Sequence, residues 1–152
     1  AVNAIGIMNG PSHTEIKATR NGAKIVELGA RLGGDCITTH LVPLSTGVDM
    51  VKCCIQIALG EACDWQSKWE KGSAIRYLKS HKGFFAGVSG IEPARKIAGI
   101  HEVDIVKSTE TEISDIESST DRIGFVVAQG DYALQAIGLC EKARNEIVIT
   151  IT

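Results

Sequence analysis

Residues 13–30, HTEIKATRNGAKIVELGA, decide the fold of the first part of the chain. Two runs rich in β-branched residues flank Arg20-Asn21-Gly22, which predicts a β-hairpin with its turn at these three residues. If the last of them takes the left-handed conformation in a three-residue loop, Glu15 lies directly opposite Glu27. A two-residue loop at Asn21-Gly22 would shift the register by one and put the two glutamates on opposite faces.

Alternating side chains divide the hairpin into two faces. One face is apolar, and we expect it to be the core side; it carries Ile16, Ala18, Val26, Leu28 and Ala30. The other face is polar and carries Glu15, Lys17, Glu27, Gly29 and Arg31. The loop length therefore decides whether both glutamates belong to the polar face.

The whole sequence predicts an α+β fold in two parts, residues 1–72 and 73–152. The opening residues AVNAIGIMNG are typical of a helix end, with Gly6 as the stop. Helical apolar spacing over residues 48–59 predicts a packing helix that ends at the next glycine. The polar segment 61–72 contains two tryptophans and fits either a loop or a short helix.

From residue 73 the chain changes to short strand-like runs separated by glycine, which predicts a small, mostly antiparallel α+β subdomain. The expected strands are AIRYLK, GFFAGVSG, HEVDIVKS, RIGFVVAQG and EIVITIT. The expected helices span residues 91–97 and 132–142. The acidic stretch 108–121 is the one segment that we expect to be weakly ordered.

The composition argues against several classes of protein. With 16 Lys+Arg against 18 Asp+Glu the net charge is -2, and binding to nucleic acid is not expected because phosphate neutralisation needs clustered basic residues. The sequence has no run of about 18 apolar residues and no signal-peptide pattern, so we expect no membrane partner and a cytoplasmic location. The 5 cysteines form no C-x-x-C pair and are expected to be reduced and packed.

Glu15 and Glu27 suggest the chemistry of the hairpin. Two carboxylates about 5 Å apart at Cβ on neighbouring strands repel each other unless a cation bridges them. Mg²⁺ suits this role because it binds hard oxygen ligands and completes its shell with water and substrate phosphates. Arg31, on the same face, would then point at a phosphoryl or acyl-phosphate oxygen, and the Gly33-Gly34 backbone would let a substrate approach closely.

A plainer interpretation of the same spacing stays open. The two glutamates would then be solvated outer-face residues that form weak surface salt bridges with Lys17 and Arg31. His13 either orients the carboxylate of Glu15 and touches substrate, or bonds the loop backbone at the strand end. We expect the large aromatic side chains to pack rather than to form a ligand cage; these are Trp65, Trp69, Phe84 and Phe85.

The segment GPSHTEIKATRNGAKIVELGARLGGD, residues 10–35, resembles the metal-binding hairpin of the ATP-grasp superfamily, in particular of carboxylate–amine ligases related to L-amino-acid ligases. The pattern is G-x-x-H-x-E, a turn, and then E-x-x-x-R-x-G-G-D. The continuation THLVPLSTGVDMVKCCIQIALGE, residues 39–61, is similar to the strand and helix that follow in that family. The resemblance implies that the chain is the C-terminal part of an ATP-grasp fold.

The resemblance also implies roles for the matching residues. Glu15 and Glu27 are similar to the Mg²⁺ (or Mn²⁺) ligands that bridge the phosphates of ATP, and Arg31 matches the residue that steadies the acyl-phosphate. Gly34 lies where a backbone N–H meets the carboxylate substrate. Many ATP-grasp enzymes have Asn as a further metal ligand two residues after the second glutamate, whereas this chain has Gly29. A second Mg²⁺ would therefore depend more on water.

The implied activity joins a small-molecule carboxylate to an amine. ATP activates the carboxylate as an acyl-phosphate, the amine attacks it, and ADP and phosphate leave. The missing N-terminal domains of such an enzyme would precede Ala1, so we expect this chain alone to be inactive and to expose an apolar surface that permits homodimerisation. The alternatives are a stand-alone binding or interaction domain, and a biotin-carboxylase-like or purine-pathway ATP-grasp ligase.

Overall fold

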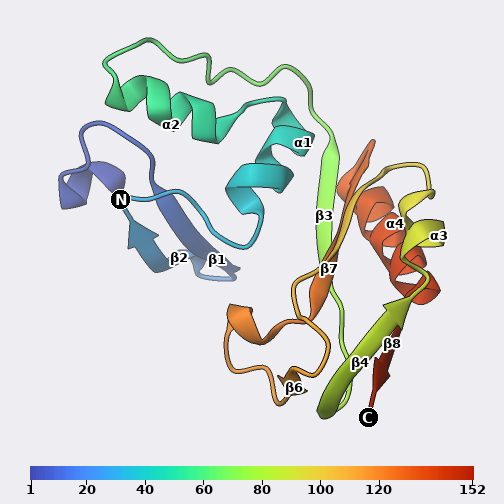
Figure 1. The fold of residues 1–152 in the computed structure, drawn as a ribbon. Helices are drawn as coiled ribbons and strands as arrows, with labels where there is room; N and C mark the ends of the chain where they lie inside the picture. Colours follow the sequence, from blue (N-terminus) through green and yellow to red (C-terminus); the bar gives the residue numbers. More distant parts are fainter. The chain divides into compact units, whose positions relative to one another are not determined.

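The chain folds as an α+β protein in which every strand pair is antiparallel, as the sequence predicted. The computed structural model describes all 152 residues. They divide into two units, which Figure 1 traces from blue to red. The first unit comprises Ala1–Pro43 and Gly47–Lys68, and the second comprises Leu44–Thr46 and Trp69–Thr152.

The first unit contains the expected hairpin, formed by β1 (His13–Thr19) and β2 (Gly22–Gly29). Its turn differs from the prediction, because Thr19 pairs with Gly22 and only two residues remain in the loop. Gly22 has the positive φ of 91° that the prediction required. A shorter loop shifts the register by one at this end of the hairpin.

A β-bulge at Val26 reverses that shift. Ile16 pairs with Ile25, but the next pair is Glu15 with Glu27, so Val26 has no partner across the ladder. The predicted opposition of Glu15 and Glu27 is therefore present, although a bulge produces it and not the three-residue turn.

The apolar face of the hairpin is not a core face within this chain. Ile16 and Ile25 are 59% and 55% exposed, and Val26 and Ala30 are exposed as well. Only Leu28 is half-buried. The expectation that this face packs into a core is therefore wrong for the first unit, in which no other element covers it.

Helical turns, and not the expected strand, follow the hairpin. The chain forms a π-helical turn at Ile37–Leu41 and then α1 (Val42–Thr46), which ends at Gly47 with a φ of 77°. Pro43 lies in the first turn of α1, where its missing N–H costs nothing and its fixed φ favours a helix. The proline explains why these β-branched residues do not form a strand.

The remaining helices of the first unit match the sequence pattern. A short 3-10 helix, Val2–Ile5, ends at Gly6, which has a φ of 77°. The packing helix α2 spans Met50–Ala58. Its N-cap is Asp49, whose carboxylate accepts a hydrogen bond of 2.9 Å from the N–H of Lys52.

The second unit contains two three-stranded sheets with the orders β3-β7-β5 and β6-β4-β8. The strands of the first sheet are β3 (Gly72–Tyr77), β7 (Gly124–Gly130) and β5 (Ile100–Ile105). The strands of the second are β6 (Glu112–Ile113), β4 (Gly83–Ser89) and β8 (Val148–Ile151). The helices are α3 (Ile91–Arg95) and α4 (Ala133–Glu146), so α4 extends four residues beyond its predicted end.

The main core lies between the first sheet and the two helices, which Figure 1 shows side by side in the second unit. On β7, Val126 and Ala128 are fully buried. The helix α4 contributes Ala136, Cys140 and Ala143 at helical spacing, and these small side chains allow the helix to approach the sheet closely. A second, smaller core contains Phe85, Ile113 and Ile123.

The structure corrects two expectations, one about the order of the acidic stretch 108–121 and one about the packing of the large aromatic side chains. The acidic stretch is ordered by β6 and by a 3-10 turn, Ser119–Asp121, in which Asp121 accepts hydrogen bonds from the N–H groups of Ser118 and Glu117. These bonds lower the pKa of the Asp121 carboxyl group. Of the aromatic residues expected to pack, only one is buried, Phe85; Trp65, Trp69 and Phe84 are exposed.

No single helix of the chain has the length and apolar composition needed to span a membrane. The segments Ile37–Thr46 and Met50–Ala58 reach that length only when they are counted together across a bend of 111°.

Gly90 tests the packing of α3 against the end of α4. It has a φ of 81°, and a Cβ added there would lie 1.7 Å from the carbonyl oxygen of Glu146. We expect Gly90→Ala to lower the free energy of unfolding by at least about 2 kcal/mol, because both strain and overlap oppose the methyl group. The matched control is Gly138→Ala on α4, where a Cβ meets nothing within 4 Å. Alanine should stabilise that helix by about 0.5–1 kcal/mol, and a similar loss in both variants by urea unfolding would contradict the described packing.

The buried thiol of Cys140 should make the stability of the protein depend on pH. Its sulfur is buried 3.4 Å from the carbonyl oxygen of Ala74, and burial raises the pKa of the thiol from 9.0 to about 11. The folded chain therefore keeps a proton that the unfolded chain loses as the pH rises from 9.0 towards 11, so stability falls in this window and not below it. Relative to Cys140→Ala, the wild-type free energy of unfolding should fall by up to about 1.4 kcal/mol per pH unit there. The measurement is urea unfolding of both proteins at neutral pH and at about pH 10. If the wild type and Cys140→Ala differ in free energy of unfolding by the same amount at both pH values, this assignment is contradicted.

Candidate functional site

The polar face of the hairpin brings Glu15 and Glu27 together. They are direct partners across β1 and β2, and partners in an antiparallel pair point to the same face. Their side chains are 51% and 49% exposed, so both carboxylates are open to a ligand from solution. Lys17 and Lys24, the pair nearer the turn on the same strand face as Glu15, add positive charge beside them.

His13 lies beside Glu15 at the start of β1. Its Nε2 atom is 3.4 Å from Oε1 of Glu15, and only 15% of its side chain is exposed. The other ring nitrogen faces Gly33, where an added Cβ would lie 3.0 Å from Nδ1 of His13 and 3.2 Å from Cγ2 of Ile37. The absence of a side chain at Gly33 therefore leaves the room in which the imidazole sits.

Thr38 anchors the loop that contains Gly33 and Gly34, which we call the glycine loop. Its side chain is buried, and its hydroxyl donates a hydrogen bond of 2.8 Å to the carbonyl oxygen of Gly33. The Gly34 carbonyl oxygen in turn accepts a bond of 2.9 Å from the N–H of Ile37. A Cβ at Gly34 would meet nothing within 4 Å, so this backbone is open to an approaching group.

Arg31 folds back over the hairpin. Its guanidinium donates to Oε1 of Glu27 and, over 3.1 Å, to the carbonyl oxygen of Leu32. The side chain of Arg31 runs past Gly29, where an added Cβ would lie in ordinary contact, 3.4 Å from Cγ of Arg31. The pairing of Arg31 with Glu27 is the one that the plainer surface interpretation predicted, whereas Glu15 pairs with His13 and not with Lys17.

The Arg31–Glu27 pair does not remove Glu27 from use. Both side chains are about half exposed, and exposed ion pairs contribute only about 0–1 kcal/mol. A doubly charged cation or a phosphoryl group would therefore compete readily for either partner. Pairings connect His13 with Glu15, Glu15 with Glu27 and Glu27 with Arg31, and Gly34 follows the Gly33 that faces His13; we call His13, Glu15, Glu27, Arg31 and Gly34 together the hairpin site.

The oxygen donors of the hairpin site fit a hard divalent cation. Two carboxylates on one face are the protein ligands that Mg²⁺ typically takes when water and phosphate oxygens complete its octahedron. No three His, Cys, Asp or Glu side chains converge as a metal centre of their own. The donor set therefore suits a cation that arrives with a phosphate-bearing ligand and does not suit a permanently bound structural metal.

Sequence reasoning did not identify two residues that shape the hairpin site. Val26, at the bulge, sets the register of the glutamates, and a single alternating strand gives no sign of a bulge. Thr38 fixes the glycine loop, and a lone threonine in an apolar run carries no signal of that role.

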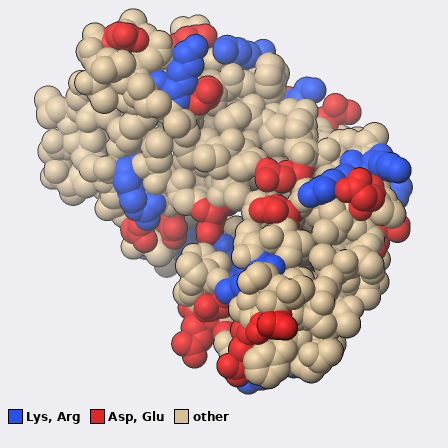
Figure 2. All heavy atoms as spheres, in the orientation of Figure 1, with Lys and Arg blue, Asp and Glu red and all other residues tan.

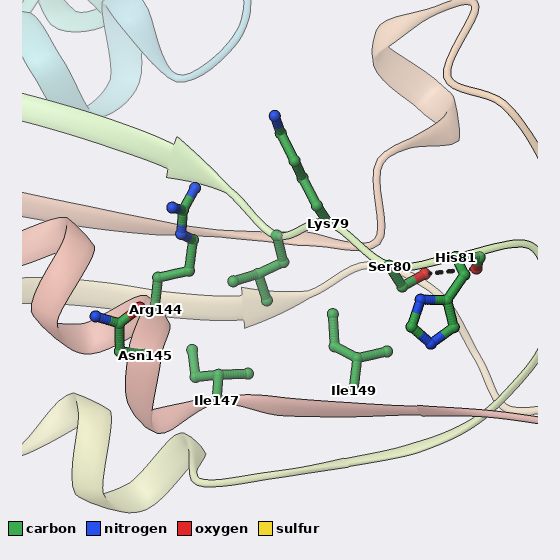
Figure 3. Close-up of a pocket in the computed structure, with 8 residues that line it drawn as sticks. Lys79, Ser80, His81, Arg144, Asn145, Ile147 and Ile149 are labelled. Atoms are coloured by element: carbon green, nitrogen blue, oxygen red, sulfur yellow. Dashed lines mark hydrogen bonds between the residues drawn. The ribbon is translucent and has the colours of Figure 1, made fainter.

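The second unit contains cavities of its own. Figure 3 shows one in the second unit, of about 350 Å³, with Ile147 and Ile149 side by side, Arg144 and Asn145 at one end and His81 at the other. Lys79 points away from the two isoleucines in this view. None of the predicted site residues lines this cavity.

The charged side chains do not gather into one basic surface on the face that Figure 2 shows. Lys and Arg lie there singly or next to Asp and Glu. Ion pairs of the second unit include Arg76 with Glu141 at 2.8 Å and Lys82 with Asp115 at 2.6 Å.

Comparisons with known proteins agree with this architecture. The family model described as L-amino acid ligase C-terminal domain 2 matches residues 70–152. An uncharacterized protein of Sinorhizobium fredii, y4rH, is 29% identical over 147 residues. That alignment covers 96% of this chain and 30% of the relative, so the chain spans about a third of the relative's length.

Solved structures share the fold. The L-amino acid ligase from Bacillus licheniformis is 21% identical with a TM-score of 0.84, over 99% of this chain and 38% of that one. Phosphoribosylglycinamide synthetase from Anaerococcus prevotii is 22% identical with a TM-score of 0.83, over 99% and 39%. The biotin carboxylase domain of Hydrogenobacter thermophilus 2-oxoglutarate carboxylase, in complex with MgADP and bicarbonate, is 20% identical with a TM-score of 0.66, over 92% and 32%.

The family match covers more than half of the chain, and the whole chain superposes on ATP-grasp ligases, as the sequence resemblance implied. At identities of 22% and 21% the solved structures show only the fold. The family model is what identifies the chain as similar to L-amino acid ligases. The chain belongs to the L-amino acid ligase family of ATP-grasp ligases.

Proposed function

We propose that the chain forms the metal- and acyl-phosphate-binding part of an ATP-dependent carboxylate–amine ligase. The observation that carries this proposal is the direct opposition of Glu15 and Glu27 on one open face of the hairpin. Like charges in this arrangement repel, and a shared divalent cation removes the repulsion. Glu15 and Glu27 would hold Mg²⁺ or Mn²⁺, which supplies charge neutralisation for the ATP phosphates when it is bound.

Arg31 would act on the reacting phosphoryl group. A guanidinium offers a rigid fork of donors that matches phosphate oxygens, and its attraction grows as negative charge develops on them. Release from Glu27 costs little because the pair is half exposed. Arg31 would therefore exchange one carboxylate oxygen for an acyl-phosphate oxygen without a change of the backbone.

Gly34 and His13 would serve the carboxylate substrate. The backbone at Gly34 is open to a close approach, and Thr38 holds the carbonyl of its neighbour Gly33. His13 lies between Gly33 and Glu15, where it orients the Glu15 carboxylate and borders the substrate space. In this arrangement catalysis depends on positioning and charge, as in other phosphoryl-transfer sites, and needs no protein nucleophile.

The proposed reaction is the one that the family name suggests. ATP would activate an amino acid carboxylate as an acyl-phosphate, an amine would displace phosphate, and ADP would leave. The protein would work in the cytoplasm, where ATP is available. Because the chain spans 38% of the Bacillus licheniformis ligase, we propose that it acts only together with the other domains of such an enzyme and binds nucleotide weakly by itself.

Activity of the full-length gene product tests this proposal. We expect phosphate release from ATP and Mg²⁺ in the presence of pairs of L-amino acids. Glu27→Gln should lower kcat by about 100-fold or more, because it removes a charge that the phosphate-bound cation needs.

The matched control for this experiment is Glu61→Gln, an exposed glutamate outside the hairpin site. It should keep wild-type activity. Equal activity of the Glu27→Gln and Glu61→Gln enzymes would rule out the proposed metal role of the hairpin.

Alanine substitutions at Gly33 and Gly34 distinguish an effect on substrate binding from an effect on folding. Gly34→Ala should leave the free energy of unfolding within about 0.5 kcal/mol, because its Cβ meets nothing, yet raise the KM for the carboxylate substrate about tenfold. Gly33→Ala should lower the unfolding temperature, because its Cβ would press on His13 and Ile37. The measurements are thermal unfolding and steady-state kinetics. An unchanged KM in Gly34→Ala would refute the assigned role of that backbone.

A further inference from the structure

Three cysteines of the first unit line one small cavity. The cavity has a volume of about 280 Å³ and lies between α2, the loop that follows it and the segment that leads into β1. Its lining consists of Cys53, Cys54 and Cys63 together with Met50, Ile57, Trp65 and Gly10–Ser12. Four of these residues contribute sulfur, so the lining of the cavity is largely apolar and its sulfur atoms are polarizable.

Within this cavity Cys53 and Cys63 are direct neighbours. The side chain of Cys53 is only 6% exposed, and its thiol donates a hydrogen bond of 3.4 Å to the carbonyl oxygen of Asp64. Cys63, the residue before Asp64, is a hydrogen-bonding neighbour of the Cys53 side chain. Burial, and then this contact, raise the pKa of the Cys53 thiol, so Cys53 stays protonated at neutral pH. Cys63 is less buried than Cys53.

The end of α2 explains why the two cysteines meet. Gly60 takes a positive φ of 75° after the last helical turn, and the N–H of Glu61 bonds the carbonyl oxygen of Gln56 over 2.8 Å. This left-handed ending reverses the chain. The loop then returns along the helix and carries Cys63 to the side of Cys53, ten positions earlier in the sequence.

We propose that Cys53 and Cys63 are a redox pair that closes to a reversible disulfide when the protein meets a peroxide. The thiolate of Cys63, the more accessible sulfur, attacks hydrogen peroxide, takes one oxygen as a sulfenic acid and releases hydroxide. The Cys53 thiol then loses its proton as its sulfur attacks the Cys63 sulfur, the new S–S bond forms, the S–OH bond breaks, and the leaving hydroxide takes that proton and departs as water. Two thiols and one peroxide give one disulfide and two water molecules, with two electrons passing from sulfur to oxygen.

Cys54 is the competing partner, because it lines the same cavity. It follows Cys53 directly on α2, so its side chain is turned by about 100° around the helix axis. A metal is the competing occupant of such a sulfur-rich cavity. No three cysteine, histidine or acidic side chains converge as a metal site, however, so the contact between Cys53 and Cys63 favours a covalent pair over a soft cation.

Mass spectrometry of the complete chain tests the pair. The chain is treated with hydrogen peroxide, its remaining thiols are alkylated, and it is digested with trypsin and a glutamate-specific protease. Trypsin cuts after Lys52 and Lys68, and the second protease separates residues 53–61 from residues 62–68 after Glu61. We expect these two peptides to remain linked, with a loss of two hydrogen atoms, and to separate after dithiothreitol.

Matched serine variants locate the bond. Cys54→Ser should still give the linked peptides, whereas Cys53→Ser and Cys63→Ser should not. Cys140→Ser should behave like wild type, because Cys140 lies in the core of the second unit.

The outcomes of the experiment are distinct. Linked peptides that are lost in Cys54→Ser would overturn the assignment in favour of Cys54. Cysteines that stay reduced, or that oxidise to sulfinic acid without a link, would overturn the proposal altogether. The test does not involve ATP or the hairpin site, so its result is independent of the proposed ligase function.

Discussion

The hairpin site depends on the β-bulge at Val26. The two-residue turn sets a register in which Glu15 would face Val26, and the extra residue moves Glu27 into that place. Two negative charges on one face are unfavourable for folding, and the guanidinium of Arg31 reduces the cost at Glu27. His13 lies against Glu15, and Arg31 lies against Glu27. The fold thus keeps a repulsive pair that becomes favourable when a divalent cation is shared.

The rest of the first unit holds this pair in a fixed setting. Thr38 binds the carbonyl of Gly33, Gly33 leaves space for the ring of His13, and His13 contacts Glu15. Each contact is short and local, so a change in the glycine loop reaches the carboxylates through packed atoms. The apolar face of the hairpin stays exposed within this unit.

Much of the fold followed from the sequence, because local patterns determine it. Most strands and helices after residue 73 are marked by glycine and by apolar alternation, and their positions were predicted closely, whereas β6 and the 3-10 turn Ser119–Asp121 were not predicted. The failures have physical causes. Pro43 favours helical turns where β-branched residues suggested a strand, and the bulge adds a residue that no alternation pattern reveals. The expected core face at Ile16 is open because burial depends on partners outside the strand itself.

The most direct measurement is the position of a bound cation. Crystals of the full-length protein grown with Mn²⁺ and an ATP analogue would show the metal by its anomalous scattering. We expect one peak about 2.1 Å from carboxylate oxygens of both Glu15 and Glu27, with Arg31 turned from Glu27 towards a phosphate. A nucleotide-bound structure in which the metal touches neither glutamate, and Arg31 remains on Glu27, would contradict this expectation.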